Sequence, residues 1–119
     1  MGGVGDRTGA IMGGSFSIGD ETPLKSSNLD LGRLTLAIAQ HETGFFTTGV
    51  GVTHNNGCGI RRNGAFERYE TPEESLIDCT EVLNRHYEGM TVEQIAQYWT
   101  TTQREEWINN VTYFYNKSI

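Results

Sequence analysis

Residues 71–89, TPEESLIDCTEVLNRHYEG, carry the clearest helix signal in the chain. Thr71 offers a capping hydroxyl, Pro72 suits the first helical position, and Glu74 stands where it can bond back to the cap. Side chains suited to a buried face then recur every three or four residues until Gly89 ends the pattern. They are Leu76, Ile77, Cys79, Thr80, Val82, Leu83, His86 and Tyr87. The stretch therefore predicts an amphipathic helix that packs on a core.

A second helix is predicted upstream, over residues 28–41. Its buried positions again recur at spacings of three and four residues. They are Leu31, Leu34, Ala37, Ile38 and His41. Ser27 or Asn28 can cap this helix, and Asp30 would then lie in its first turn, where its charge meets the positive end of the helix dipole.

Two more helices are predicted downstream, each from a Thr followed three residues later by a Glu or Gln. Thr91 with Gln94 opens a short helix, and Thr102 with Glu105 opens the last one. The buried stripe of the last helix would consist of Trp107, Val111 and Phe114.

The intervening residues 45–70 contain five glycines between Val, Thr, Phe and Tyr residues, which predicts loops with one short β-hairpin. Four helices with such an insertion after the first indicate a small, α-dominant α+β domain, with a cleft beside the glycine-rich segment.

The chain has 119 residues, enough for one small domain, and seven of its 15 glycines lie in the first 27 residues. We therefore expect residues 1–27 to form a flexible arm or linker and residues 28–119 to form the domain. The net charge of −6 argues against nucleic-acid binding. The chain contains neither an apolar run long enough for a membrane span nor a recognisable secretory signal.

Glu42 is the first candidate for chemistry, because Gly44 ends the upstream helix and leaves this acid at its C-terminal end. Apolar residues on both sides would desolvate the carboxyl group, raise its pKa and make it a usable proton donor. An isolated acid at a helix end is more commonly just solvated, so the position alone does not decide its role.

No metal or other cofactor is expected. His41 and Glu42 start a metalloprotease-like pattern, but the position of the second histidine is occupied by Phe45. The three histidines of the chain, His41, His54 and His86, show no ligand spacing. Cys58 and Cys79 could close one loop, but packed, unbonded thiols are the favoured interpretation.

Three motifs occur in a recognisable order: a helix ending in residues 39–44, AQHETG; residues 55–61, NNGCGIR; and residues 66–75, FERYETPEES. In this order they resemble the lysozyme-superfamily glucosaminidases that cut peptidoglycan, and the related lytic transglycosylases. The resemblance covers about residues 28–115. It departs from the family pattern at Arg61, where Lys is usual, and at Thr71, where Ser is usual.

The resemblance implies cleavage of β-1,4 bonds between N-acetylglucosamine and N-acetylmuramic acid, with Glu42 protonating the leaving oxygen. Tyr98 aligns with the active-site tyrosine of the family. Glu67 and Glu70 are both candidates for a second carboxylate, and the substrate's own acetamido group or C6 hydroxyl is the alternative nucleophile. The expected glycan-binding residues are Asn55, Asn56, Gly59, Ile60 and Tyr69.

Peptidoglycan glycan strands are thus the expected partner. The site of action would be the bacterial cell wall, in a periplasmic, extracellular or virion-associated setting, and the arm could attach the domain to a phage or secretion assembly. The acidic net charge by itself offers no attraction to an anionic wall. Three alternatives stay open: a lytic transglycosylase with a single catalytic Glu, a non-catalytic glycan-binding or structural domain, and a module whose acidic helix docks a basic partner.

Overall fold

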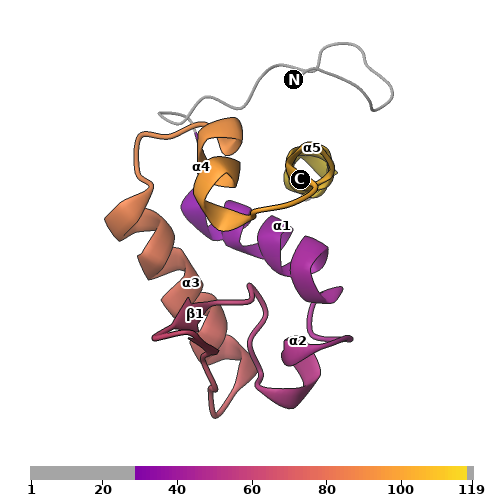
Figure 1. Cartoon of the computed structure of the whole chain (residues 1–119), viewed down its shortest axis with the longest axis vertical. Coiled ribbons are helices and arrows are strands. Elements are labelled where there is room, and N and C mark those ends of the chain that lie inside the picture. Colours follow the sequence, from indigo (N-terminus) through magenta and orange to yellow (C-terminus); the bar gives the residue numbers. More distant parts are fainter. Residues whose placement is uncertain (1–28, 118–119) are drawn as a thin grey trace.

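The computed structural model describes residues 29–117, which form five helices and one two-stranded antiparallel hairpin (Figure 1). The elements are α1 (Leu31–Thr43), α2 (Val50–Thr53), β1 (Arg61–Arg62), β2 (Ala65–Phe66), α3 (Pro72–His86), α4 (Val92–Trp99) and α5 (Arg104–Lys117). The α-dominant α+β class is confirmed, including the hairpin. Among the described residues, no helix is long and apolar enough to cross a membrane. The predicted arm, residues 1–27, lies outside the described part.

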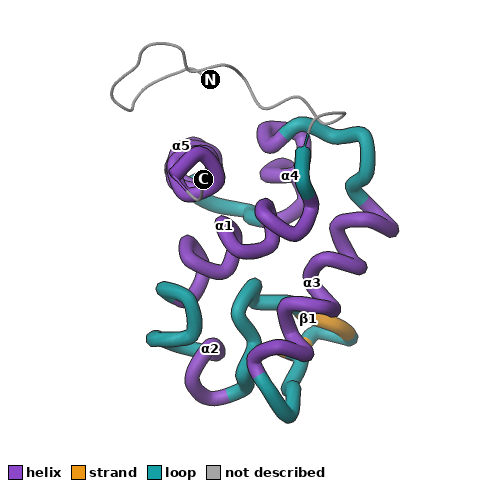
Figure 2. Tube along the Cα trace, turned by 180° about the vertical axis from the view of Figure 1, so that it is seen from behind, coloured by secondary structure: helices purple, strands orange, loops and turns teal. Residues whose placement is uncertain are grey.

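The elements separate into two regions along the molecule. Figures 1 and 2 show α2, the hairpin and most of the loops at one end, with α4 and α5 at the other. α1 runs between them and packs against both α3 and α5. Glu42 lies in its last turn, and so at the junction of the loop region and the helical region.

The core is formed by apolar side chains from α1, α3, α4 and α5 together with the loop before β1. Its largest members that are 2% exposed or less are Leu34, Ile38, Leu83, Ile95, Trp107 and Val111. Burying a side chain of this size is worth about 1.5–3 kcal/mol, so these few residues supply much of the driving force for the fold.

The start of α1 differs from the prediction. Asp30 is the N-cap itself, not a first-turn residue, and its Oδ1 accepts a hydrogen bond of 3.2 Å from Arg33 N. The two expected caps, Ser27 and Asn28, lie outside the described residues. The helix also runs to Thr43, past the expected end near His41, and Gly44 stops it in the left-handed region, with φ of 58°.

α3 follows the prediction at its start but not along its whole face. Thr71 Oγ1 accepts from Glu74 N as expected, whereas Glu74 Oε1 accepts from Glu70 N, one residue before the cap. The prediction of a buried Ile77 is wrong, because this side chain is 61% exposed. The helix ends at His86, three residues before the glycine that was expected to stop it.

The last two helices show one correct and one wrong capping prediction. The reciprocal box of Thr91 and Gln94 is present. The box of Thr102 with Glu105 is absent, because α5 begins only at Arg104. The buried residues of α5 are Trp107, Val111 and Tyr115, while Phe114, expected in this stripe, is only partly buried.

Tyr115 also joins the two ends of the described fold. Its hydroxyl accepts a hydrogen bond of 2.9 Å from Asp30 N, and its carbonyl accepts one of 2.7 Å from Arg33 Nε. The Arg33 guanidinium lies 4.5 Å from the centre of the Tyr115 ring. The first turn of α1 is therefore fastened to the last turn of α5.

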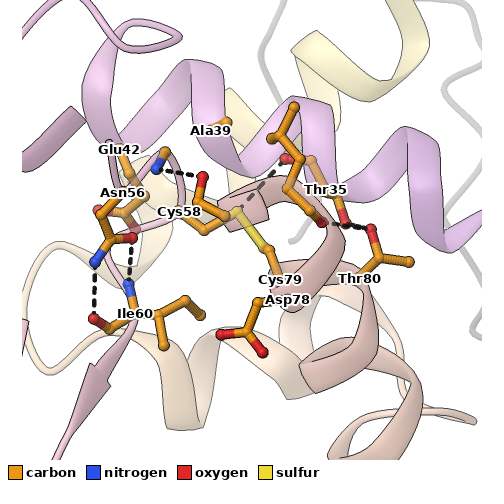
Figure 3. The surroundings of a disulfide bond; sticks show 12 residues. Thr35, Ala39, Glu42, Asn56, Cys58, Ile60, Asp78, Cys79 and Thr80 are labelled. Carbon is orange, nitrogen blue, oxygen red and sulfur yellow. Dashed lines mark hydrogen bonds between the residues drawn. A yellow bond between two sulfur atoms is a disulfide. The ribbon is translucent and has the colours of Figure 1, made fainter. Parts of the chain in front are cut away.

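Cys58 and Cys79 form a disulfide, so the prediction of unbonded thiols is wrong. Both residues are fully buried, and their Cα atoms are 6.4 Å apart, within the range that a disulfide spans. The bond joins the loop before β1 to the buried face of α3 (Figure 3). Their proximity depends on the path of the intervening chain, which residue spacing does not reveal.

Candidate functional site

Glu42 opens onto a cleft of about 570 Å³ between the hairpin and the end of α4. The walls come from the end of α1, the loop and hairpin, the second half of α3 and the end of α4. The lining residues are Glu42, Gly59, Ile60, Arg61, Arg62, Phe66, Val82, Arg85, His86, Tyr87, Tyr98 and Trp99. The cleft lies beside the glycine-rich segment, as the sequence predicts.

Trp107 fixes the orientation of the Glu42 carboxyl group. The indole Nε1–H donates a hydrogen bond of 2.8 Å to Glu42 Oε2. Trp107 is only 2% exposed and packs edge-on against His41, so it cannot easily move. Assigning Trp107 to the core is correct, but the sequence gives no sign that its one polar atom would bind this acid.

The pKa of Glu42 lies above the usual value for a glutamate, because the surrounding protein partly desolvates the carboxyl group. The hydrogen bond from Trp107 and the charge of His41 act in the opposite direction, since both favour the carboxylate. Desolvation outweighs them. The net shift is in the direction that a proton donor at near-neutral pH requires.

Gly59 faces the other oxygen of Glu42. A Cβ atom at this position would lie 3.7 Å from Glu42 Oε1, so the glycine presents bare backbone to the carboxyl group. Its φ of +73° also favours glycine. With Oε2 bound to Trp107, Oε1 is the atom left to act in the cleft.

Asn56 holds the loop in this position from inside the protein. It is fully buried, and its Oδ1 accepts from Ile60 N at 3.0 Å (Figure 3). Its Nδ2 donates to Ile60 O at 2.9 Å and to Glu67 O at 3.0 Å. The amide group is thus saturated by the backbone of the loop and of the segment after β2.

The other predicted glycan-binding residues divide into two groups. Gly59 and Ile60 line the cleft, whereas Asn55 and Tyr69 do not. Asn55 Nδ2 donates to Tyr69 O and Glu70 O, which holds the loop before β1 against the segment after β2.

The hydroxyl groups of Thr43 and Ser75 form a clamp on the backbone of Gly57, which the sequence did not predict. Thr43 Oγ1 donates to Gly57 O at 2.9 Å, and Gly57 N donates to Ser75 Oγ at 3.1 Å. Thr43 and Ser75 are both buried, so α1 and α3 each contribute a hydroxyl to the backbone of the same residue, one on either side of its Cα. Gly57 itself must stay small, because a Cβ there would lie 2.6 Å from the ring of Phe46.

The backbone turns sharply just after Glu42, at the end of α1. Gly44, Phe45 and Phe46 have φ values of 58°, 57° and 72°, which places three successive residues in the left-handed region. For the two phenylalanines this conformation is strained, so packing must hold it. The strained turn brings the Phe46 ring onto Gly57 and so positions the loop that faces Glu42.

Neither candidate for a second carboxylate lines the cleft. Glu67 forms an ion pair with Arg62, with 3.5 Å between the charged atoms, and the backbone N–H of Glu70 donates to Glu74. Among the described residues that line the cleft, Glu42 is the only acid.

Tyr69 belongs to a network behind the hairpin. Its hydroxyl donates to Asp78 Oδ2 at 2.5 Å, and Arg62 donates to both oxygens of Asp78. The Arg62 guanidinium keeps the pKa of Asp78 below its usual value, and burial raises the pKa of Tyr69. This network fastens β1 to α3 and so fixes one wall of the cleft.

Tyr98 contributes to an aromatic wall. Its ring centre lies 6.1 Å from that of Tyr87, which in turn lies 5.7 Å from Trp99. Trp99 lies 6.2 Å from Trp107, the residue that binds Glu42. Tyr98 is 69% exposed, and its hydroxyl forms no hydrogen bond with any described residue. Tyr87 was predicted only as part of the buried face of α3, because aromatic spacing in a helix indicates only burial.

No three His, Cys, Asp or Glu side chains within residues 29–117 gather closely enough to hold a metal ion.

The Glucosaminidase family model, described as mannosyl-glycoprotein endo-beta-N-acetylglucosaminidase, matches residues 25–118. The chain therefore belongs to this family, and the resemblance seen in its motifs is confirmed. Family membership indicates a glycosidase with a glycan substrate. Comparison with the curated proteins and with the solved structures gave no significant match.

Proposed function

We propose that this protein cleaves the β-1,4 bonds of peptidoglycan between N-acetylglucosamine and N-acetylmuramic acid, with Glu42 as the general acid. The observation that carries the proposal is the environment of Glu42. One oxygen is fixed by Trp107 at 2.8 Å, the other faces Gly59 across the cleft, and the pKa is raised. A carboxyl group so arranged stays protonated at a higher pH than a solvated one and is aimed at a bound glycan.

In the proposed reaction, the proton on Glu42 Oε1 passes to the glycosidic oxygen while the bond from that oxygen to C1 breaks. The sugar ring then carries the positive charge of an oxocarbenium-like state. Because no other acid lines the cleft among the described residues, an attack on C1 by a group of the substrate is favoured over attack by a protein carboxylate.

Two such groups lead to different products. If the acetamido oxygen attacks C1, water later opens the cyclic intermediate and a reducing end results. If the C6 hydroxyl of N-acetylmuramic acid attacks, its proton returns to the Glu42 carboxylate and an anhydro end results, as in a lytic transglycosylase. The single carboxylate supports both routes, so the transglycosylase is the second candidate function.

Tyr98 is the residue we assign to the acetamido group. Its exposed, unbonded hydroxyl on the cleft wall is free to donate a hydrogen bond to a substrate oxygen. The remaining predicted residues take supporting roles in the proposal: Gly59 and Ile60 line the glycan path, and Asn55, Asn56 and Tyr69 hold the loop and the hairpin in place.

The test is incubation with purified peptidoglycan and identification of the released ends by mass spectrometry, with Glu42→Gln as the matched variant. The amide keeps the shape and the hydrogen bond from Trp107 but has no proton to give, so we expect the rate to fall by at least about 100-fold. In the same assay, Tyr98→Phe should lower the rate without changing the products.

The product ends distinguish the candidates. Reducing ends mean hydrolysis, and the sugar at the end identifies the bond. Anhydro ends mean the transglycosylase. If Glu42→Gln releases as much product as the wild type, or if neither releases any while both bind the wall, the catalytic proposal fails and a non-catalytic glycan-binding domain takes its place.

A further inference from the structure

The charge of the cleft is opposite to that of the chain. The protein carries a net charge of −6, yet the cleft is lined by Arg61, Arg62 and Arg85 against the single acid Glu42. Low-dielectric walls strengthen the field inside a cleft, so the local sign determines which ligand is attracted. The acidic groups that give the chain its net charge lie elsewhere.

The three arginines are not equally available to a ligand. The charge of Arg62 is matched by Asp78, at 2.8 and 3.1 Å, and by Glu67 at 3.5 Å. Among the described residues, Arg85 forms one loose ion pair, with Glu81 at 3.9 Å, and both side chains are more than half exposed. Such a surface pair contributes little and exchanges readily with a better partner. The charge of Arg85 also helps to lower the pKa of Asp78, whose carboxylate is already bound by Arg62.

Arg61 is the most available of the three. Its guanidinium carbon lies 4.1 Å from the centre of the Phe66 ring, and it forms no ion pair with any described residue. A guanidinium stacked on an aromatic face is held in one orientation while its N–H edge stays free. That edge matches the two oxygens of a carboxylate.

We propose that Arg61 and Arg85 recognise a carboxylate carried by the glycan, so that the cleft prefers an anionic strand to a neutral one with the same β-1,4 linkage. This inference rests on the proposed function and specifies its substrate. In peptidoglycan the carboxylate comes either from the lactyl group of N-acetylmuramic acid or from the peptide attached to it. A mannosyl glycan or a chitin oligosaccharide carries no ionised group at all.

The experiment compares kcat/KM on four substrates: peptide-bearing glycan strands, strands freed of peptide, the same freed strands with their carboxylates amidated, and chitohexaose. The variants are Arg61→Gln and Arg85→Gln, with Arg104→Gln as the control. Arg104 is an exposed arginine at the start of α5 that does not line the cleft. The control thus removes the same charge from a different place.

We expect the wild type to prefer anionic strands. In each cleft variant the ratio of kcat/KM for anionic to neutral strands should fall by about three- to tenfold, mainly because KM for the anionic strands rises. Arg104→Gln should keep the preference. If the cleft variants lose the preference for strands freed of peptide, the recognised group is the lactyl carboxylate. If they lose the preference only for peptide-bearing strands, the recognised carboxylate belongs to the peptide. If amidation and both cleft variants leave the ratio of anionic to neutral turnover unchanged, the inference is overturned.

A failure of the proposed function is distinguishable from a failure of this inference. If no cleavage depends on Glu42, the same substrates are titrated by calorimetry into Glu42→Gln, with and without Arg61→Gln. Weaker binding of anionic strands in the double variant supports the carboxylate site even in a non-catalytic domain. Equal binding of amidated and unmodified strands refutes it.

Discussion

At Glu42, opposing influences act on one carboxyl group. The surrounding protein favours the neutral form, while the Trp107 indole and the His41 charge favour the ionised form. Activity as an acid needs the neutral form before the reaction, and the ionised form must be tolerable after the proton has left. Trp107 therefore serves both states: it holds the side chain in place and limits how far the pKa rises.

Replacing Trp107 by Phe tests this balance. The variant removes the hydrogen bond that stabilises the carboxylate, so the pKa of Glu42 should rise further. In the proposed mechanism the free enzyme is active with Glu42 protonated, so the alkaline limb of the kcat/KM profile should move to higher pH. Trp99→Phe is the control, since it replaces the indole next to Trp107 by a smaller ring and leaves the hydrogen bond from Trp107 to Glu42 in place. A limb that stays in place, or moves to lower pH, would contradict the assignment.

Residue identity predicted part of this site and missed another part. Glu42 and Gly59, which both line the cleft, could be picked out from their motifs through the family resemblance. The inward orientation of Asn56 could not, since an asparagine in a turn reads the same whether its amide meets a sugar or the backbone of its own loop. The hydroxyl clamp of Thr43 and Ser75 was missed for a related reason: small polar residues on helices give no sign of being buried.

Between elements, the disulfide provides the covalent link that holds the glycine loop against α3. It closes a loop across a sequence separation of 21 residues, between Cys58 and Cys79. Limiting the unfolded chain in this way stabilises the folded state by about 3 kcal/mol. Gly59 follows Cys58 directly, so the disulfide also helps to hold the Gly59 backbone in its position facing Glu42.

The double variant Cys58→Ala/Cys79→Ala should lose about 3 kcal/mol of unfolding free energy, measured by urea denaturation at constant pH. A reducing agent should lower the stability of the wild type toward that of the variant and leave the variant unaffected. Equal stabilities of oxidised wild type and variant would show that the bond contributes nothing.

The four main helices and the N-caps of α3 and α4 were predictable, whereas the start of α1, the start of α5 and the end of α3 were not. Hydrophobic spacing locates a helix because burial repeats with the helical turn, but the cap depends on where the incoming chain permits it. Asp30 caps α1 while its backbone N–H bonds to Tyr115, a contact from the far end of the sequence. The short α2 escaped prediction because four residues, one of them Gly51, are too few to show periodicity.

At the scale of the whole molecule, the composition gives the net charge, whereas ligand binding depends on where the individual charges lie. The net charge of −6 predicted no attraction to an anionic polymer, but folding gathers Arg61, Arg62 and Arg85 around one cleft. They come from the hairpin and from α3, and only the fold brings these elements together. Domain class could thus be predicted from the sequence, and the electrostatics of the site could not.

Removal of residues 1–24 tests whether the described fold is sufficient alone. The family match begins at residue 25, and the buried core is built from residues of the described part between Leu34 and Tyr115. We therefore expect the shortened chain to keep the thermal midpoint of the full chain and its Glu42-dependent activity. A loss of 1 kcal/mol would lower the midpoint by about 4–8 °C in a domain of this size, so calorimetry would detect it.

The fastening of Asp30 to Tyr115 means that the chain enters and leaves the domain at one place. Flanking segments on the two sides therefore begin close together, and a host protein would need to open only a narrow gap in one of its surface turns to accept the whole domain as an insert. Such an insertion would leave the cleft accessible, because the cleft lies near Glu42, at the opposite end of α1 from that point of attachment.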